Sequence, residues 1–234
     1  MQDFSLALGT AASLLAGGDP ELWQIIGLSL AVTLSATLFA TLVGAPLGAL
    51  LAISRFPGRR LIVVVLNGFM GLPPVVVGLS VYLLLSRSGP LGSLGILFTA
   101  RAMVIAQSLL IMPIIASLMR QVIEDAWSEY REQLVSLGAN TKIAIATLLW
   151  DTRYSLVTAL LAGFGRAAAE VGAVMIVGGN IAHYTRVMTT AIALQTSMGD
   201  LPQALALGFV LIVIIIGINA VAFGIRSWAQ RRYR

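Results

Sequence analysis

The sequence predicts an all-α, polytopic membrane protein with about five transmembrane helices. Of the 234 residues, 58% are hydrophobic and only 11% are charged, and the mean hydropathy is +0.93. Soluble domains carry about 25% charged residues. The hydrophobic residues form long runs without Asp, Glu, Lys or Arg, and these runs reach the roughly 18 residues that cross a bilayer. The chain has no cysteine and one histidine, so disulfides are excluded and no metal site is expected.

Five spans follow from these runs. Four are free of charge, and the other contains Arg166 and Glu170. The first span is long enough that it must tilt, project or bend near Pro46. Residues 1–20 are too short to cross and are expected to be extracytoplasmic or interfacial, whereas residues 21–234 form one transmembrane domain. The spans cover residues 22–54, 61–86, 102–119, 154–180 and 201–225.

The distribution of Lys and Arg predicts the orientation. With five spans, most of the 15 basic residues fall on one side, and the other side receives Arg87, Arg101 and Arg186. The positive-inside rule then places the N-terminus outside and the C-terminus in the cytoplasm. The net charge of +5 is therefore a topology signal, and no nucleic-acid partner is expected.

Residues 120–153 form the one substantial cytoplasmic segment. This segment is rich in charges and has helical patterning, but it is far too short for an enzyme domain. Lys142 does not follow a glycine-rich turn of the phosphate-binding type. We therefore expect that the chain is not an enzyme, binds no cofactor and does not hydrolyse nucleotide by itself.

The second span is interrupted by adjacent prolines. In "GFMGLPPVVVG" (residues 68–78), Pro73 and Pro74 each lack the N–H that a helix needs. A simple bend is one interpretation, since membrane helices tolerate proline. We favour a discontinuous or sharply kinked helix beside a transport path, because broken helices near the midplane recur at transport sites.

The fourth span carries the two charges at membrane depth. Arg166 and Glu170 are four residues apart, so in a continuous helix they would share one face and could pair. A structural ion pair is the favoured interpretation, because a passage for anions needs an accessible positive charge. The alternative is that Arg166 lines such a passage and Glu170 holds it in place.

Hydroxyl groups gather after the fourth span. Thr189 and Thr190 lie in an apolar stretch, residues 187–194, that is too short to cross the membrane. This stretch is predicted to be a short re-entrant or external helix whose hydroxyls could meet an oxyanion. A plain extracellular connector is the alternative.

The cytoplasmic segment "EQLVSLG" resembles the motif shared by permease subunits of bacterial ATP-binding-cassette importers. That pattern is Glu-Ala-Ala, three residues, Gly, nine residues, then Ile-x-Leu-Pro, and Glu132 and Gly138 match it. The stretches at residues 71–95 and 162–192 are similar to the molybdate, tungstate and sulfate permeases, the second to the tungstate type in particular. At the other motif positions the chain departs from the pattern with Gln133, Leu134, Leu148, Trp150 and Asp151.

The resemblance, which covers most of residues 21–225, implies a type I importer fold and an assembly of several chains. The partners would be a second copy of the chain, two cytoplasmic ATPase subunits that bind ATP-Mg, and an extracytoplasmic oxyanion-binding protein. It also implies a short coupling helix that docks on each ATPase, with Gly138 as its C-terminal cap. The residues expected in this helix are Glu132, Gln133, Leu134, Gly138, Ala139, Asn140 and Thr141.

These observations together predict the membrane subunit of an ATP-driven importer in a bacterial or archaeal cytoplasmic membrane. The cargo would be a tetrahedral oxyanion, with tungstate ahead of molybdate and then sulfate. The alternative is an ATP-independent carrier or channel for anions, in which Arg166 and Glu170 would relay ions or protons. The residues predicted to form a gate or path are Pro73, Pro74, Arg166, Glu170, Thr189 and Thr190.

Overall fold

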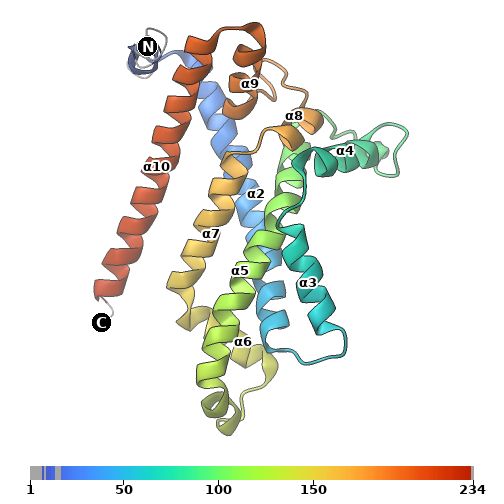
Figure 1. Ribbon diagram of the computed structural model, residues 1–234, viewed down its shortest axis with the longest axis vertical. Helices are drawn as coiled ribbons and strands as arrows, with labels where there is room; N and C mark the ends of the chain where they lie inside the picture. The colour runs from blue at the N-terminus through green and yellow to red at the C-terminus, as the bar shows by residue number, and fades with distance from the viewer. Residues whose placement is uncertain (1–6, 8, 14–16, 233–234) are drawn as a thin grey trace. The chain divides into compact units, whose positions relative to one another are not determined.

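The structure, a computed structural model, describes residues 7, 9–13 and 17–232, and the side chains of this set as far as residue 228. The predicted interfacial segment, residues 1–20, therefore lies partly outside the described residues. The all-α prediction is confirmed, because every regular element in the described part is helical. The elements in Figure 1 are α2 (Pro20–Ile53), α3 (Arg59–Phe69), α4 (Pro74–Leu85), the 3-10 turn η1 (Gly92–Leu94), α5 (Ala100–Ser136), α6 (Thr141–Asp151), α7 (Arg153–Ala168), α8 (Gly172–Gly178), α9 (Met188–Met198) and α10 (Leu201–Arg232).

Three helices of the described residues are long and apolar enough to cross a membrane: Pro20–Ile53, Ala100–Ser136 and Leu201–Trp228. The number rises to five if α3 with α4, and α7 with α8, each make one bent span. The predicted five spans therefore correspond to three continuous helices and two broken ones.

The chain folds into two compact units. Unit 1 comprises Met1–Ala36, Pro73–Gln107 and Ala167–Val221, and unit 2 comprises the rest. Helices α2, α5, α7 and α10 each contribute to both units. The chain passes from one unit to the other just before Pro73 and just before Ala167. Both points lie within three residues of a helix break. The breaks in the predicted spans are thus also boundaries of the fold.

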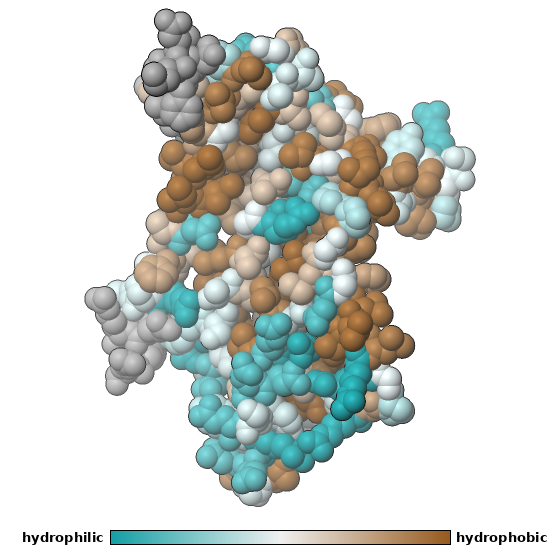
Figure 2. All heavy atoms as spheres, viewed as in Figure 1, coloured by the Kyte–Doolittle hydropathy of each residue, from teal (hydrophilic) through white to brown (hydrophobic). Residues whose placement is uncertain are grey.

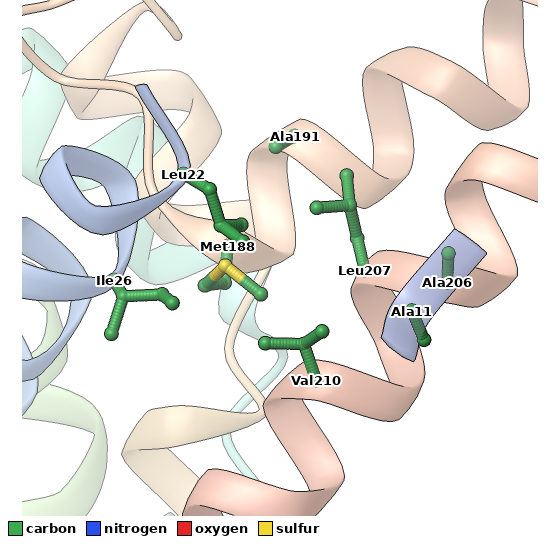
Figure 3. Packing of buried hydrophobic residues seen from close by; sticks show 8 residues of the cluster. All are labelled: Ala11, Leu22, Ile26, Met188, Ala191, Ala206, Leu207 and Val210. Atoms are coloured by element: carbon green, nitrogen blue, oxygen red, sulfur yellow. The ribbon is translucent and has the colours of Figure 1, made fainter. Parts of the chain in front are cut away.

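A cluster of buried side chains holds unit 1 together near the first turns of α2 and α10. Met188 and Ala191 of α9 lie between residues of those two helices (Figure 3). Ala11 packs on the same cluster, so this part of the N-terminal segment is buried. The remaining members are Leu22, Ile26, Ala206, Leu207 and Val210.

Glycine allows α2 and α5 to approach closely in unit 2. A Cβ atom on Gly44 would lie 3.0 Å from the Met112 carbonyl oxygen, and one on Gly48 would lie 2.3 Å from the Ala116 carbonyl oxygen. This Gly-x-x-x-Gly spacing is a common device for packing membrane helices. Pro46 lies between the two glycines inside α2, which runs through it as one helix.

A charged cluster closes the other end of the α2–α5 contact. Arg59 donates from Nε to the Leu51 carbonyl at 2.7 Å, and its Nη2 lies 2.9 Å from Glu124 Oε1. Arg120 contacts the second oxygen of Glu124. A cation near the carbonyl end of α2 is favourable for the helix dipole. These bonds fix the start of α3 against α5.

The helices differ from the predicted spans in two places. The third span was predicted over residues 102–119, and α5 continues beyond it as one helix to Ser136. The span predicted over 154–180 contains a break, because α7 ends at Ala168 and α8 begins at Gly172. Charge content marks where a helix can leave the membrane, but it does not end the helix, because Glu and Arg are good helix formers.

Candidate functional site

The turn between α5 and α6 depends on the backbone of Gly138. Its φ is +72°, in the left-handed region, and a Cβ there would meet nothing within 4 Å. Ala139 donates from its amide to the Leu134 carbonyl at 2.9 Å, which closes the end of α5. Glycine adopts this conformation without the penalty that a Cβ brings. The predicted helix end at Gly138 is confirmed.

The segment expected to be one short coupling helix is in fact a corner between two helices. Asn140 caps α6, since its Oδ1 accepts from the Ile143 amide at 3.0 Å. Glu132 lies near the end of the 37-residue helix α5, whereas it was expected in the first turns of a short helix. We call residues 132–143 the coupling corner.

The coupling corner carries three exposed hydrophobic side chains. Leu137 is 81% exposed, Val135 59% and Ile143 53%. Hydrophilic residues surround the α5–α6 connection, as Figure 2 shows. Contiguous apolar groups on a polar surface are a candidate interface with another protein. Sequence reasoning missed these three residues, although apolar residues within a charged segment were a usable signal.

The residues predicted to couple do not all face outward. Leu134 is half-buried and packs on a cluster from α2, α5 and α6, and Ala139 is also half-buried. The structure therefore places Leu134 among the side chains that hold the corner to unit 2. The predicted residues that are exposed are Glu132, Gln133, Gly138, Asn140 and Thr141.

The proline pair produces a true interruption, as predicted. Pro73 is extended, with φ −64° and ψ 122°, and Pro74 is the first residue of α4. Proline suits that position, because the first N–H groups of a helix have no partner within it. The amides of Val76 and Val77 both donate to the Pro73 carbonyl, at 3.1 and 3.2 Å.

The second break was not predicted, and it changes the role of Glu170. This residue lies between α7 and α8, so the prediction that Arg166 and Glu170 share a face of one helix was wrong. The Glu170 side chain is buried, and its Oε1 accepts from the Ala173 amide at 3.1 Å. Glu170 therefore caps α8, while Arg166 lies half-buried in the last turn of α7, where the helix dipole favours a cation.

Side chains from other elements satisfy the carbonyl groups that this break frees. Gln107 of α5 donates from Nε2 to the Ala167 carbonyl at 3.0 Å. Thr189 of α9 donates from Oγ1 to the Glu170 carbonyl at 2.8 Å. Irregular backbone within a membrane is tolerated only when its polar groups find partners in this way. Gln107 was missed, because no local pattern connects it with a break 60 residues away.

Both predicted threonines face the protein interior. The Thr190 hydroxyl accepts from the Val187 amide and donates to the Val187 carbonyl, each at 3.0 Å. Both side chains are buried. The short helix predicted over residues 187–194 exists as α9, but these hydroxyl protons bond to backbone carbonyls.

The helices that follow the two breaks pack directly on one another. A Cβ on Gly78 of α4 would lie 2.7 Å from the Cα of Ala173 in α8. One on Gly172 would lie 3.2 Å from Cγ2 of Val75. Small residues are therefore required on both sides of this contact. Pro74 lies beside the start of α8, so within unit 1 the two helices begin next to each other.

The described residues hold no cluster of three or more His, Asp or Glu that could bind a metal ion. The candidate functional features of the described chain are thus an exposed corner and two helix breaks.

Comparison with known proteins decides the family. Residues 44–234 match the family described as "Binding-protein-dependent transport system inner membrane component". The chain belongs to this family. Its permeases include a tungstate uptake system permease protein, TupB, of Peptoclostridium acidaminophilum, which is 44% identical over 93% of this chain and 95% of its own length.

Two further permeases are similar to the chain. A probable anion ABC transporter permease protein of Haloferax volcanii is 35% identical over 88% of this chain and 91% of its own length. A sulfate transport system permease protein, CysW, of a Synechocystis species is 30% identical over 71% of this chain and 63% of its own length. The resemblance deduced from the motifs is confirmed.

Membership establishes the general role. The chain is a multi-pass permease subunit of an ABC importer and is not itself an enzyme. A binding-protein-dependent permease works with a separate ATPase and with a binding protein. The alternative prediction of an ATP-independent carrier or channel was wrong.

Proposed function

We propose that this permease carries tungstate, with molybdate and then sulfate as weaker cargoes. The observation that carries the proposal is the 44% identity to a tungstate uptake permease along nearly the whole chain. The similar sulfate permeases reach 30% identity or less over about 70% of the chain. The alignment with the tungstate permease spans both helix breaks and the coupling corner. This coverage supports a shared path for the anion as well as a shared fold.

The working assembly would contain two copies of this chain, two cytoplasmic ATPase subunits that hold ATP-Mg, and one extracytoplasmic oxyanion-binding protein. This chain itself would bind no cofactor. The N-terminus would lie outside and the C-terminus in the cytoplasm of a bacterial or archaeal cell. The basic residues at the end of α10 support this orientation.

The coupling corner would dock on the ATPase. Leu137, Val135 and Ile143 would fill an apolar groove there, since each gains by leaving water. Glu132 supports the same assignment, because a carboxylate near the C-terminal end of a helix opposes the helix dipole. A donor on the ATPase would compensate for this cost. Gln133, Gly138, Ala139, Asn140 and Thr141 would shape the corner, while Leu134 anchors it to the permease.

The two breaks would act as hinges of the gate. Each lies beside a boundary between the two units, and hinges are commonly residues at the ends of elements. Pro73 and Pro74 would let α4 move without breaking a helical hydrogen bond. Glu170 would keep α8 capped during such movement, with Thr189 and Thr190 holding α9 in place. Arg166, at the end of α7, is the residue we assign to the path of the anion.

Uptake into proteoliposomes tests the cargo. The permease would be reconstituted with its ATPase, supplied with the binding protein and ATP, and given tungstate together with a tenfold excess of molybdate or of sulfate. We expect tungstate uptake to persist in both mixtures. Uptake that stops in excess molybdate or sulfate, while either competitor enters faster than tungstate, would contradict the proposed cargo.

A further inference from the structure

A cleft in unit 1 lies between the start of α2, α9 and the start of α10. Its volume is about 120 Å³, and it is open to solvent. Its apolar wall comes from Leu22, Ile25, Ala191, Leu194 and Leu207. Its polar wall comes from Asp19, Glu21, Arg186, Gln195 and Gln203. None of these residues has a role in the coupling corner or at the helix breaks.

The charges of the cleft are unequal. Two carboxylates, Asp19 and Glu21, face a single cation, Arg186. Arg186 Nη1 lies 3.8 Å from Glu21 Oε1, and the Glu21 side chain is half-exposed, so this ion pair is long and weak. Asp19 Oδ1 accepts from the Glu21 amide at 3.0 Å, which caps α2 and leaves its charge in place. The cleft therefore has a net negative charge.

The position of the cleft on α10 indicates the side of the membrane. Leu207 lies in the first turns of this helix, and the same helix carries Arg226, Arg231 and Arg232 at its other end. Under the positive-inside rule the arginine end is cytoplasmic, so the cleft opens on the extracytoplasmic side. A net negative charge there repels an oxyanion, which argues against a cargo site.

We propose that the cleft receives a Lys or Arg side chain of the extracytoplasmic binding protein; this rests on the proposed function. The apolar wall matches the aliphatic part of such a side chain, and the carboxylates match its charged end. Glu21 has lone pairs to spare, since its single contact with a cation is the 3.8 Å pair with Arg186 among the described residues.

The affinity of the binding protein for the reconstituted permease–ATPase complex tests this assignment. The probe is the purified binding protein loaded with tungstate, titrated onto the complex in lipid discs. The variant is Asp19→Asn with Glu21→Gln, which removes both charges and keeps side chains of the same size; Asn also caps helices well. We expect the Kd to rise about tenfold or more, because close charge pairs across an interface contribute at least that much.

Asp200→Asn is the matched control. Asp200 caps α10 by accepting from the Gln203 amide at 3.1 Å, as Asp19 caps α2, but it does not line the cleft. We expect the Kd of the binding protein for the Asp200→Asn complex to stay within about twofold of the original value, because helix caps tolerate exchange of Asp for Asn. An equal rise in the control would assign the effect to general surface charge and overturn the proposal.

Two other outcomes separate this inference from the proposed function. If the unsubstituted complex binds the protein and takes up tungstate, but the double variant binds as well or more tightly, the cleft assignment fails and the proposed function stands. If the unsubstituted complex neither binds nor transports, the proposed function fails. The affinity of the unsubstituted complex should also fall with added salt more steeply than that of the double variant.

Discussion

The coupling corner and the break between α7 and α8 interrupt helices in opposite ways. At the corner, Leu137 is exposed, and the backbone is shaped by the left-handed glycine and one asparagine cap. At the break, the freed carbonyls accept from Gln107 and Thr189, and the Glu170 side chain caps the next helix. The corner thus leaves apolar side chains exposed, whereas the polar groups of the break are satisfied within its own chain.

This difference matches the proposed roles, docking for the corner and movement for the break. A docking surface keeps apolar groups free, because their burial drives association. A hinge inside a membrane has no water to replace lost hydrogen bonds, so its partners must belong to the protein. Substitutions at the break should therefore lower the stability of the chain itself. Those at the exposed apolar side chains of the corner should alter only its partnership with the ATPase.

The largest loss of stability is expected from Gly78→Ala. The added Cβ would lie 2.7 Å from the Cα of Ala173, so the backbone of α4 or α8 would have to shift. We expect destabilisation by about 3 kcal/mol, the upper part of the usual range for overpacking. Thermal unfolding in detergent measures it. Gly68→Ala in α3 is the control, since a Cβ there meets nothing within 4 Å. Equal stability of the two variants would refute the close α4–α8 contact.

An intermediate loss is expected from Thr189→Val. Valine keeps the shape but leaves the buried Glu170 carbonyl without its 2.8 Å hydrogen bond. Such a group costs about 1–3 kcal/mol. Thr196→Val is the matched control in the same helix, because that hydroxyl is exposed and donates to the Ile192 carbonyl of its own helix. If both variants unfold at the same temperature as the original protein, the Thr189 hydrogen bond does not stabilise the backbone between α7 and α8.

The smallest effect on stability is expected from Leu137→Ala, at the coupling corner. Surface substitutions usually change stability by no more than about 0.5 kcal/mol. The same variant should lower the affinity of the ATPase subunit at least tenfold, because Leu137 would dock in the groove. Co-purification and titration of the ATPase measure this. Met198→Ala removes a similarly exposed side chain, 69% exposed at the end of α9, and should leave the affinity unchanged.

Much of the fold could be predicted because its causes are local. Charge-free runs located the long helices, the proline pair located one break, and Gly138 located the end of α5. The break at Glu170 has no such marker, since the alanines before it favour helix. Its cause is tertiary: Gln107, Thr189 and the α4–α8 contact stabilise an irregular backbone that the local sequence does not favour. The inward placement of Thr189 and Thr190 was hidden for the same reason.

The central claim is that this permease moves only when a separate ATPase drives it through the coupling corner. Tungstate uptake by proteoliposomes tests this most directly, with the permease and binding protein present and the ATPase subunits either included or left out. We predict ATP-dependent uptake with the ATPase, loss of that uptake in Leu137→Ala, and background levels without the ATPase. Uptake at the full rate by vesicles that lack the ATPase would contradict the claim.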